Sequence, residues 1–244
     1  MKTLSEFNSE QAFGYDFKES RLKKCIKLIS DIPIGAMLDV GCTKGDWGMF
    51  WQNRGWKVSG VDVNPDNVSA SKSAGLDAIL CDCNSERLPF KDQSFDLIFA
   101  GEVIEHLIDT DGFIADIYRC LAPGGRAIIT TPNLASFENR MRLLLGIYPI
   151  WVDYSLKGSG HVRAYTPNIL KKQLIQHGFT IRKHLGNWVP FIPQKYAHDI
   201  RYPWLSVTGD VFPSLSMDTM ILVERPNLKV VYWTFIGVNL MGDD

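Results

Sequence analysis

The sequence has few of the features that mark secreted, membrane-spanning or nucleic-acid-coating proteins. Its five cysteines are odd in number and show no C-x-x-C spacing, which argues against a disulfide framework and against a zinc knuckle. The opening stretch MKTLSEFNSEQAFGYDF is polar, and no apolar run reaches the length of a membrane span. A formal net charge of −1 provides no general attraction for long nucleic acids. We therefore expect a cytoplasmic protein with reduced thiols, and the charge disfavours a nucleic-acid partner.

The composition is that of an ordinary globular protein. Hydrophobic residues at 45% and charged residues at 22% argue against disorder, collagen-like repeats and coiled coil. A chain of 244 residues can bury one sizeable core but is short for two full domains. We expect a single α/β domain with embellishments.

Apolar, β-prone runs alternate with helical patterns over the first half of the chain. The expected strands are AMLDV, WKVSGVDV, LDAIL, FDLIFAG and RAIITT. Expected helices run through Trp51, near 66–74 and near 111–121, and a turn at residues 122–125 (APGG) stops the last of them. Such a βαβ series predicts a doubly wound, mostly parallel sheet with helices on both faces.

Further elements extend this series at both ends. Apolar residues at 22, 25, 26 and 29 repeat at helical spacing and predict an amphipathic helix that ends before Pro33 and covers the sheet or a ligand. A later helix begins at Thr166-Pro167 and ends at His177-Gly178. It is followed by the expected strands FTIRKHL and MILVER.

The expected organisation has three parts. They are a leader with a cap helix (1–34), the main domain (35–226) and an apolar tail (227–244). Two irregular segments, 133–165 and 187–216, are too long for simple connections, and we expect them to form a lid. The tail sequence KVVYWTFIGVNL is β-prone, so an edge strand, a homodimer contact and a peripheral lipid contact all stay open.

A glycine-rich turn follows the first expected strand. The segment DVGCTKG at residues 39–45 passes from the strand to a helix that begins near Asp46, and such a junction presents backbone N–H groups to a ligand. Asp62 ends the second strand about 20 residues after Gly41, where a carboxylate can accept hydrogen bonds from both ribose hydroxyls. A dinucleotide oxidoreductase would need GxGxxG, whereas these glycines stand at 41, 45 and 48.

Five motifs in order resemble class I S-adenosylmethionine-dependent methyltransferases, especially the group that acts on small molecules, quinones and sugars. The motifs are LDVGCTKG, GVDVN, CDCNSERLPF, FDLIFAGEVIEHL and LAPGGRAIITTPN. The resemblance implies a Rossmann-like sheet of seven strands with an antiparallel last strand. It also implies S-adenosylmethionine as the methyl donor and S-adenosylhomocysteine as the product. Thr43 departs from the glycine common in the family, so the loop is expected to follow a slightly different path.

The resemblance implies roles for single residues at the glycine turn. Gly41, Cys42 and Gly45 would line the methionine part of the cofactor. Asp39 would orient this turn or meet the amino group of the cofactor, and Asp62 would hold the ribose.

The adenine end is assigned in the same way. Asp82, with the backbone of Cys83, would meet the amino edge of the adenine, while Val63 and Leu88 would pack against its ring.

The acceptor side carries an ExxEH motif, formed by Glu102, Glu105 and His106, and His161 follows in GHVRAYT. The resemblance places Gly101 and Glu102 near the reacting end of the cofactor. We expect His106 to act as a general base beside Glu105, because an imidazole with a pKa near neutrality can take a hydroxyl proton. A purely structural His106 is one alternative. The other, less favoured, is a divalent metal held by the two carboxylates and two imidazoles, as in a family of RNA-terminal 2′-O-methyltransferases.

His161 and Arg163 are the candidate acceptor-binding residues, and Arg163 suits an anionic group. Aromatic side chains of the irregular segments are candidates for the wall of a pocket for a sugar, an aromatic ring or a prenyl chain: Trp151, Tyr154, Trp188, Phe191, Tyr202 and Trp204. We expect O-methylation of a small-molecule, sugar or lipid-like acceptor. A metal-dependent RNA 2′-O-methyltransferase and a non-catalytic S-adenosylmethionine-binding protein stay as alternatives.

Overall fold

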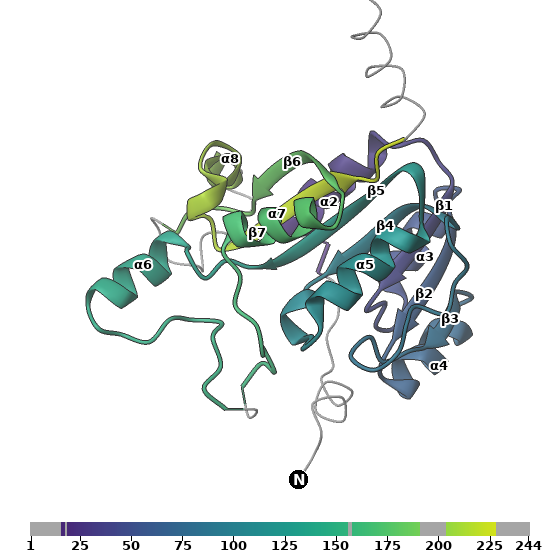
Figure 1. Ribbon diagram of the computed structural model, residues 1–244, viewed down its shortest axis with the longest axis horizontal. Helices are drawn as coiled ribbons and strands as arrows, with labels where there is room; N and C mark the ends of the chain where they lie inside the picture. The colour runs from purple at the N-terminus through teal and green to yellow at the C-terminus, as the bar shows by residue number, and fades with distance from the viewer. Residues whose placement is uncertain (1–15, 18, 156–157, 191–203, 228–244) are drawn as a thin grey trace, which may run out of the picture.

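The computed structural model describes residues 16–17, 19–155, 158–190 and 204–227, which are coloured in Figure 1. The expectations for the leader, for Phe191 and Tyr202 and for the apolar tail beyond Asn227 lie outside the described residues. Within those residues, no helix has both the length and the apolar character needed to span a membrane.

A seven-stranded sheet forms the centre of the domain. Its strands are β1 (Ala36–Val40), β2 (Lys57–Asp62), β3 (Asp77–Leu80), β4 (Phe95–Gly101), β5 (Leu121–Pro132), β6 (Thr180–Gly186) and β7 (Asp218–Glu224). They lie in the order β3-β2-β1-β4-β5-β7-β6. Neighbours among β1 to β5 are parallel, and β7 runs antiparallel to both β5 and β6. The sheet confirms the expected α/β, Rossmann-like, doubly wound fold with an antiparallel last strand.

Helices cover both faces of this sheet. They are α2 (Ser20–Ser30), α3 (Asp46–Gln52), α4 (Pro65–Ser73), α5 (Thr110–Cys120), α6 (Phe137–Leu144), α7 (Pro167–Gln176) and α8 (Trp204–Val211), with the short 3₁₀ turns η1 (Ile104–His106) and η3 (Pro213–Leu215). Side chains of α5 and α7, such as Ile114 and Leu170, are buried in one core. Leu22 of α2 and Trp47 of α3 are buried in a second core on the opposite face. Figure 1 shows α5 and α7 on the viewer's side of the sheet.

The N-terminal helix α2, expected from its apolar spacing, is tied to the chain that follows β6. The ammonium of Lys24 donates to the carbonyl oxygens of Gly186 at 2.6 Å, Asn187 at 3.1 Å and Ser206 at 2.5 Å. It also forms an ion pair with Asp210 at 2.8 Å. One side chain therefore joins α2 to two parts of the second irregular segment.

One local expectation needs correction. Residues 122–125, expected as a turn, belong to β5, although α5 does end at Cys120. The strand accommodates the two glycines with a register shift against β4 between Phe95 and Leu97, and Gly124 takes a φ of 81°. Leu121 pairs with Phe95 and Arg126 pairs with Leu97, so residues 122–125 form the irregular part of β5 between these two pairs.

The first irregular segment contains a helix that was not expected. The α6 helix begins after Ser136, whose Oγ accepts a hydrogen bond from the Asn139 backbone N–H at 3.2 Å. Leu143, Leu144 and Leu145 at its end are exposed, and Figure 1 shows α6 standing away from the sheet. Its apolar residues Phe137, Met141 and Leu144 recur at helical spacing, so α6 has an amphipathic face that is left largely exposed.

Candidate active site

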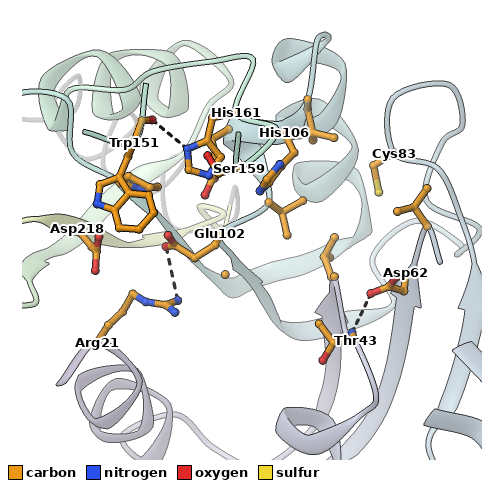
Figure 2. A pocket seen from close by; sticks show the side chains of 18 of the residues that line it. Arg21, Thr43, Asp62, Cys83, Glu102, His106, Trp151, Ser159, His161 and Asp218 are labelled. Carbon is orange, nitrogen blue, oxygen red and sulfur yellow. Dashed lines mark hydrogen bonds and ion pairs between the residues drawn. The ribbon is translucent and has the colours of Figure 1, made fainter. Parts of the chain in front are cut away.

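A cavity of about 550 Å³ lies where the parallel strands end. Figure 2 shows Thr43, Asp62 and Cys83 on one side of it, Arg21 and Asp218 on the other, and Glu102 between them. We call the first wall the glycine side, formed by Gly41, Thr43, Asp62, Val63, Asp82 and Cys83. We call the second wall the β7 side, formed by Glu19, Arg21, Trp151, His161, Asn187, Trp188 and Asp218. Gly101, Glu102, Glu105 and His106 line the cavity between these walls.

The glycine turn has the backbone that its sequence requires. Gly41 and Gly45 take φ values of 72° and 89°, in the left-handed region where glycine carries no steric cost. A Cβ on Gly41 would lie 2.8 Å from Cγ2 of Val103. Thr43 also has a positive φ, of 49°, so the turn keeps a left-handed conformation without the glycine that is common there. Strain of this kind is found at functional sites.

Asp62 is held as a fixed acceptor at the end of β2. Its Oδ2 accepts from the Thr43 N–H at 2.8 Å, and its Oδ1 accepts from the Asn64 N–H at 2.8 Å and from Asn67 Nδ2 at 3.2 Å. A carboxylate has about four acceptor positions, so these three donors leave room for a hydroxyl. The geometry suits a carboxylate that orients a diol.

The adenine candidates divide into two sets. Val63, Asp82 and Cys83 line the cavity, and the Asp82 carboxylate shapes its own turn by accepting from the Asn84 N–H at 3.0 Å. Leu88 is buried in the core and does not line the cavity. Packing of Leu88 against a ring would therefore be indirect.

Asp39, Cys42 and Gly45 lie beneath the turn, outside the cavity lining. The Asp39 side chain is fully buried, and neither of its oxygens accepts a hydrogen bond of ordinary geometry. Burial raises the pKa of the Asp39 carboxyl well above its usual range, and the nearby charge of Asp62 raises it further. Of the two roles implied for Asp39, its place under the turn suits orientation of the loop.

Glu105 is the most buried polar group of the acceptor candidates. Its Oε2 accepts from Thr131 Oγ1 at 3.0 Å, whereas its Oε1 has no hydrogen-bond partner among the described residues. Burial raises the pKa of Glu105 well above its usual range, and the charge of Glu102 adds to this. Its backbone carbonyl accepts from the N–H groups of Val162 and Arg163, so Glu105 fixes the chain beside His161.

The two histidines lie against each other above Glu105. Their ring centroids are 4.9 Å apart, with His106 Nδ1 3.2 Å from the Gly160 carbonyl and His161 Nδ1 3.0 Å from the Trp151 carbonyl. Burial, and then the neighbouring His161, lower the pKa of His106 to about 4. The expectation of a near-neutral pKa for His106 is therefore not met, and its imidazole is uncharged at neutral pH.

Three of the four suggested metal ligands come together. The ligand atoms of Glu105, His106 and His161 all lie within 4.8 Å of one another. Both imidazoles place Nδ1 at a backbone carbonyl, which is the usual outer contact of a metal-ligating histidine. The donor set and the unpartnered Glu105 oxygen fit a divalent ion. Glu102, the fourth suggested ligand, is not part of this group of described residues.

Arg163 lies outside the cavity. Its Nη2 donates to the Ile108 carbonyl at 2.5 Å, so in this structure it supports the loop after η1. Direct contact between Arg163 and an anionic acceptor would require it to move.

Arg21 and Asp218 are lining residues that the sequence did not single out. Arg21 reaches from α2 to Thr130, where its Nη1 donates to Oγ1 at 3.1 Å, and forms ion pairs with Glu19 at 2.9 Å and Glu102 at 3.5 Å. Glu102 takes a strained φ of 57° and accepts from Thr130 Oγ1 at 2.6 Å. The available signal for Arg21 was its place on a helix expected to cover a ligand.

The chain is similar in sequence to known methyltransferases. A family model described as a methyltransferase domain matches residues 38–129. A malonyl-[acyl-carrier protein] O-methyltransferase of Serratia marcescens is 29% identical over 140 residues, which are 57% of this chain and 51% of that protein. A ubiquinone biosynthesis O-methyltransferase of Psychrobacter arcticus is 25% identical over 202 residues, which are 78% of this chain and 71% of that protein. The match thus spans about half the length of the first relative and more of the second.

A solved structure shows the same fold. The S-adenosylmethionine-dependent methyltransferase from Mesorhizobium loti superposes with a TM-score of 0.60 at 16% identity, covering 84% of this chain and 98% of that one. Residues 38–129 thus match a methyltransferase domain, and the chain is similar in sequence and fold to class I S-adenosylmethionine-dependent methyltransferases.

Proposed function

We propose that the protein transfers a methyl group from S-adenosylmethionine to an oxygen atom of a small-molecule acceptor. The observation that carries the proposal is one cavity with two different walls. Asp62 and the glycine turn lie at one wall, Glu105 and His106 lie between the walls, and His161 joins them from the β7 side. Both relatives described above have names that include O-methyltransferase, which supports oxygen as the acceptor atom.

The glycine side would hold the donor. Asp62 would accept hydrogen bonds from the ribose, and Val63, Asp82 and Cys83 would border the adenine. Arg21 contributes the one guanidinium among the described lining residues, and its Nη1 lies 3.6 Å from where a Cβ on Gly101 would be. We assign Arg21 to the methionine carboxylate, because a guanidinium pairs with carboxylates in fixed geometry.

The protein has to position the acceptor against the donor, and the reaction requires no covalent intermediate with a side chain. The acceptor oxygen forms its new bond to the methyl carbon as the carbon–sulfur bond breaks, and the hydroxyl proton leaves with a base. The sulfonium of the donor supplies an already activated methyl group. His106 is uncharged at neutral pH and can accept a hydrogen bond from the hydroxyl, but the low pKa makes it a weak base. Its main contribution is then to orient the acceptor.

Calorimetric titration with S-adenosylhomocysteine tests the proposal. Asp62→Ala is expected to weaken binding by about 10- to 100-fold, because it removes charged acceptors of ribose hydrogen bonds. Asp77→Ala is the matched control, since Asp77 is an exposed carboxylate on β3 away from the cavity. Binding of NADH in place of S-adenosylhomocysteine would contradict the proposal.

A divalent metal at Glu105, His106 and His161 is the second candidate for acceptor activation. The compact ligand set favours it: its two imidazoles suit zinc and similar transition metals, and its carboxylate suits manganese or magnesium. When bound, such an ion would lower the pKa of a coordinated hydroxyl. Titration with Mn²⁺ should then show binding that His161→Ala abolishes and that His177→Ala retains, because His177 pairs with Asp111 outside the cavity. Equal weak binding by all three proteins would leave His106 as an orienting group without metal.

A further inference from the structure

The β7 side of the cavity has more negative than positive groups. The carboxyl groups of Glu19, Glu102 and Asp218 surround the single guanidinium of Arg21. Among the described lining residues, no other lysine or arginine is present. If Arg21 holds the carboxylate of the donor, this wall has even less positive charge to offer an acceptor. An anionic acceptor would therefore meet repulsion here.

Among the acids of this wall, Asp218 has a carboxylate oxygen that accepts no hydrogen bond from the described residues. It is the first residue of β7, and Asn187 fixes it twice: Asn187 Nδ2 donates to Oδ2 at 2.5 Å, and the Asp218 backbone N–H donates to Asn187 Oδ1 at 3.0 Å. None of the described residues donates a hydrogen bond to its Oδ1. Burial, and then the charge of Glu102, raise the pKa of Asp218 well above its usual range. A cation placed here would relieve that repulsion.

Two indole rings border the same space. Trp151 is 46% exposed and Trp188 is 3% exposed, and both line the cavity with Asp218. Figure 2 shows the Trp151 ring near Asp218 and Glu102. Carboxylates combined with indole faces are the chemistry that binds organic cations. Arg163, the sequence-based candidate for an anionic acceptor, lies outside this wall on the Ile108 carbonyl.

We propose that Asp218 and Trp151 form a subsite for a protonated amino group of the acceptor. The acceptor is then a molecule with both a hydroxyl, presented at His106, and an ammonium, held at Asp218. This inference rests on the proposed function, because it names the acceptor class of the same site. Asp218 is the residue that determines specificity, and it acts on binding rather than on the methyl group.

Three phenols that differ only in the charge of their tail provide the test. Tyramine carries an ammonium, 4-ethylphenol carries no charge, and 3-(4-hydroxyphenyl)propionate carries a carboxylate. Each is titrated by calorimetry into the full chain saturated with S-adenosylhomocysteine. Tyramine is expected to bind about 10- to 100-fold more tightly than the neutral phenol, as hydrogen bonds to charged groups allow, and the carboxylate should bind most weakly.

Variants assign the preference to Asp218. Asp218→Asn keeps the shape and the hydrogen bonding of the side chain and should reduce the tyramine preference to about onefold, whereas Asp218→Glu should restore part of it. Asp31→Asn removes the same charge from an exposed site after α2 and should leave the preference intact. Equal or tighter binding of the carboxylate, or no binding of any phenol, overturns the inference. Loss of S-adenosylhomocysteine binding by the unaltered protein would instead overturn the proposed function.

Discussion

The two walls of the cavity are built in different ways. The glycine side comes from neighbouring strand ends, and its main contacts join residues close to one sheet edge: the Thr43 N–H to Asp62, and Asn64 and Asn67 to Asp62. The β7 side gathers side chains from α2, from the first irregular segment and from the junctions of β6 and β7. Backbone geometry dominates the first wall, and long-range side-chain charge dominates the second.

This difference shows where variation can enter such a molecule. At Gly41 and Thr43 the glycine side depends on positive φ values that few residues adopt, so most substitutions of Gly41 are costly. The β7 side depends on the identity of single charged side chains, such as Asp218, which Asn187 holds in place. Substitution of Asp218 can change which acceptor binds while the fold remains.

The largest expected effect is on the free energy of unfolding, and it distinguishes the partly buried charge cluster around Arg21 from an ion pair at the surface. Arg21→Met leaves Glu19 and Glu102 without their partly buried partner and should lower the free energy of unfolding by about 3–5 kcal/mol. Arg87→Met breaks the ion pair of a side chain that is 77% exposed and should cost less than about 1 kcal/mol. Urea denaturation measures both. Similar losses in the two variants would show that the cluster on the β7 side is no more than a surface network.

The pH dependence of stability gives the next effect. An unfolded histidine has a pKa of about 6.5, whereas burial lowers that of His106 to about 4. The unfolded chain therefore binds this proton first as the pH falls. The associated stability is fully present above about pH 6.5 and decreases toward pH 4, by roughly 3 kcal/mol at most.

Variants of two histidines distinguish the contribution of the cavity to this pH dependence from that of the sheet. Burial also lowers the pKa of His184 on β6 to about 4, so His106→Gln and His184→Gln should each make the acid limb of the stability curve shallower. Saturating S-adenosylhomocysteine should alter the contribution of His106, which lines the cavity, more than that of His184. An unchanged acid limb in His106→Gln would contradict the lowered pKa.

The smallest expected effect on the unfolding free energy measures the steric contact between Gly41 and Val103 at the glycine turn. Gly41 and Gly146 have nearly equal φ values, 72° and 70°, but an added Cβ meets Val103 Cγ2 at 2.8 Å in the first case and nothing within 4 Å in the second. Gly146→Ala should cost about 1 kcal/mol of unfolding free energy from backbone strain alone, and Gly41→Ala about 1 kcal/mol more. Thermal unfolding would measure the difference. Val103→Ala should recover part of the excess in Gly41→Ala, and a failure to do so would exclude that contact as its cause.

The sequence predicted the sheet and the glycine side because both depend on short-range patterns. The run of buried strands, the glycines of the turn and the acid at the end of β2 can each be recognised within a few residues. The seven strands and the antiparallel last strand followed from the resemblance and are confirmed. The roles assigned to Asp62 and Asp82 stay predictions until a ligand is bound.

The β7 side could not be predicted in the same way. Arg21 and Asp218 are almost two hundred residues apart, and no local pattern distinguishes either from an ordinary surface charge. The low pKa of His106 depends on burial and on His161, which packing alone determines. The helix α6 was missed although Phe137, Met141 and Leu144 recur at helical spacing, because eight residues provide only a short apolar pattern.

The attachment of Lys24 also bears on how this wall can be altered over evolutionary time or by engineering. Three of its four contacts are to main-chain oxygens, which every amino acid possesses. The loop held by this ammonium can therefore exchange most of its side chains without losing its anchor. A library that randomises the chain around Asn187 and Ser206 but retains Lys24 is a direct way to seek new acceptor selectivity.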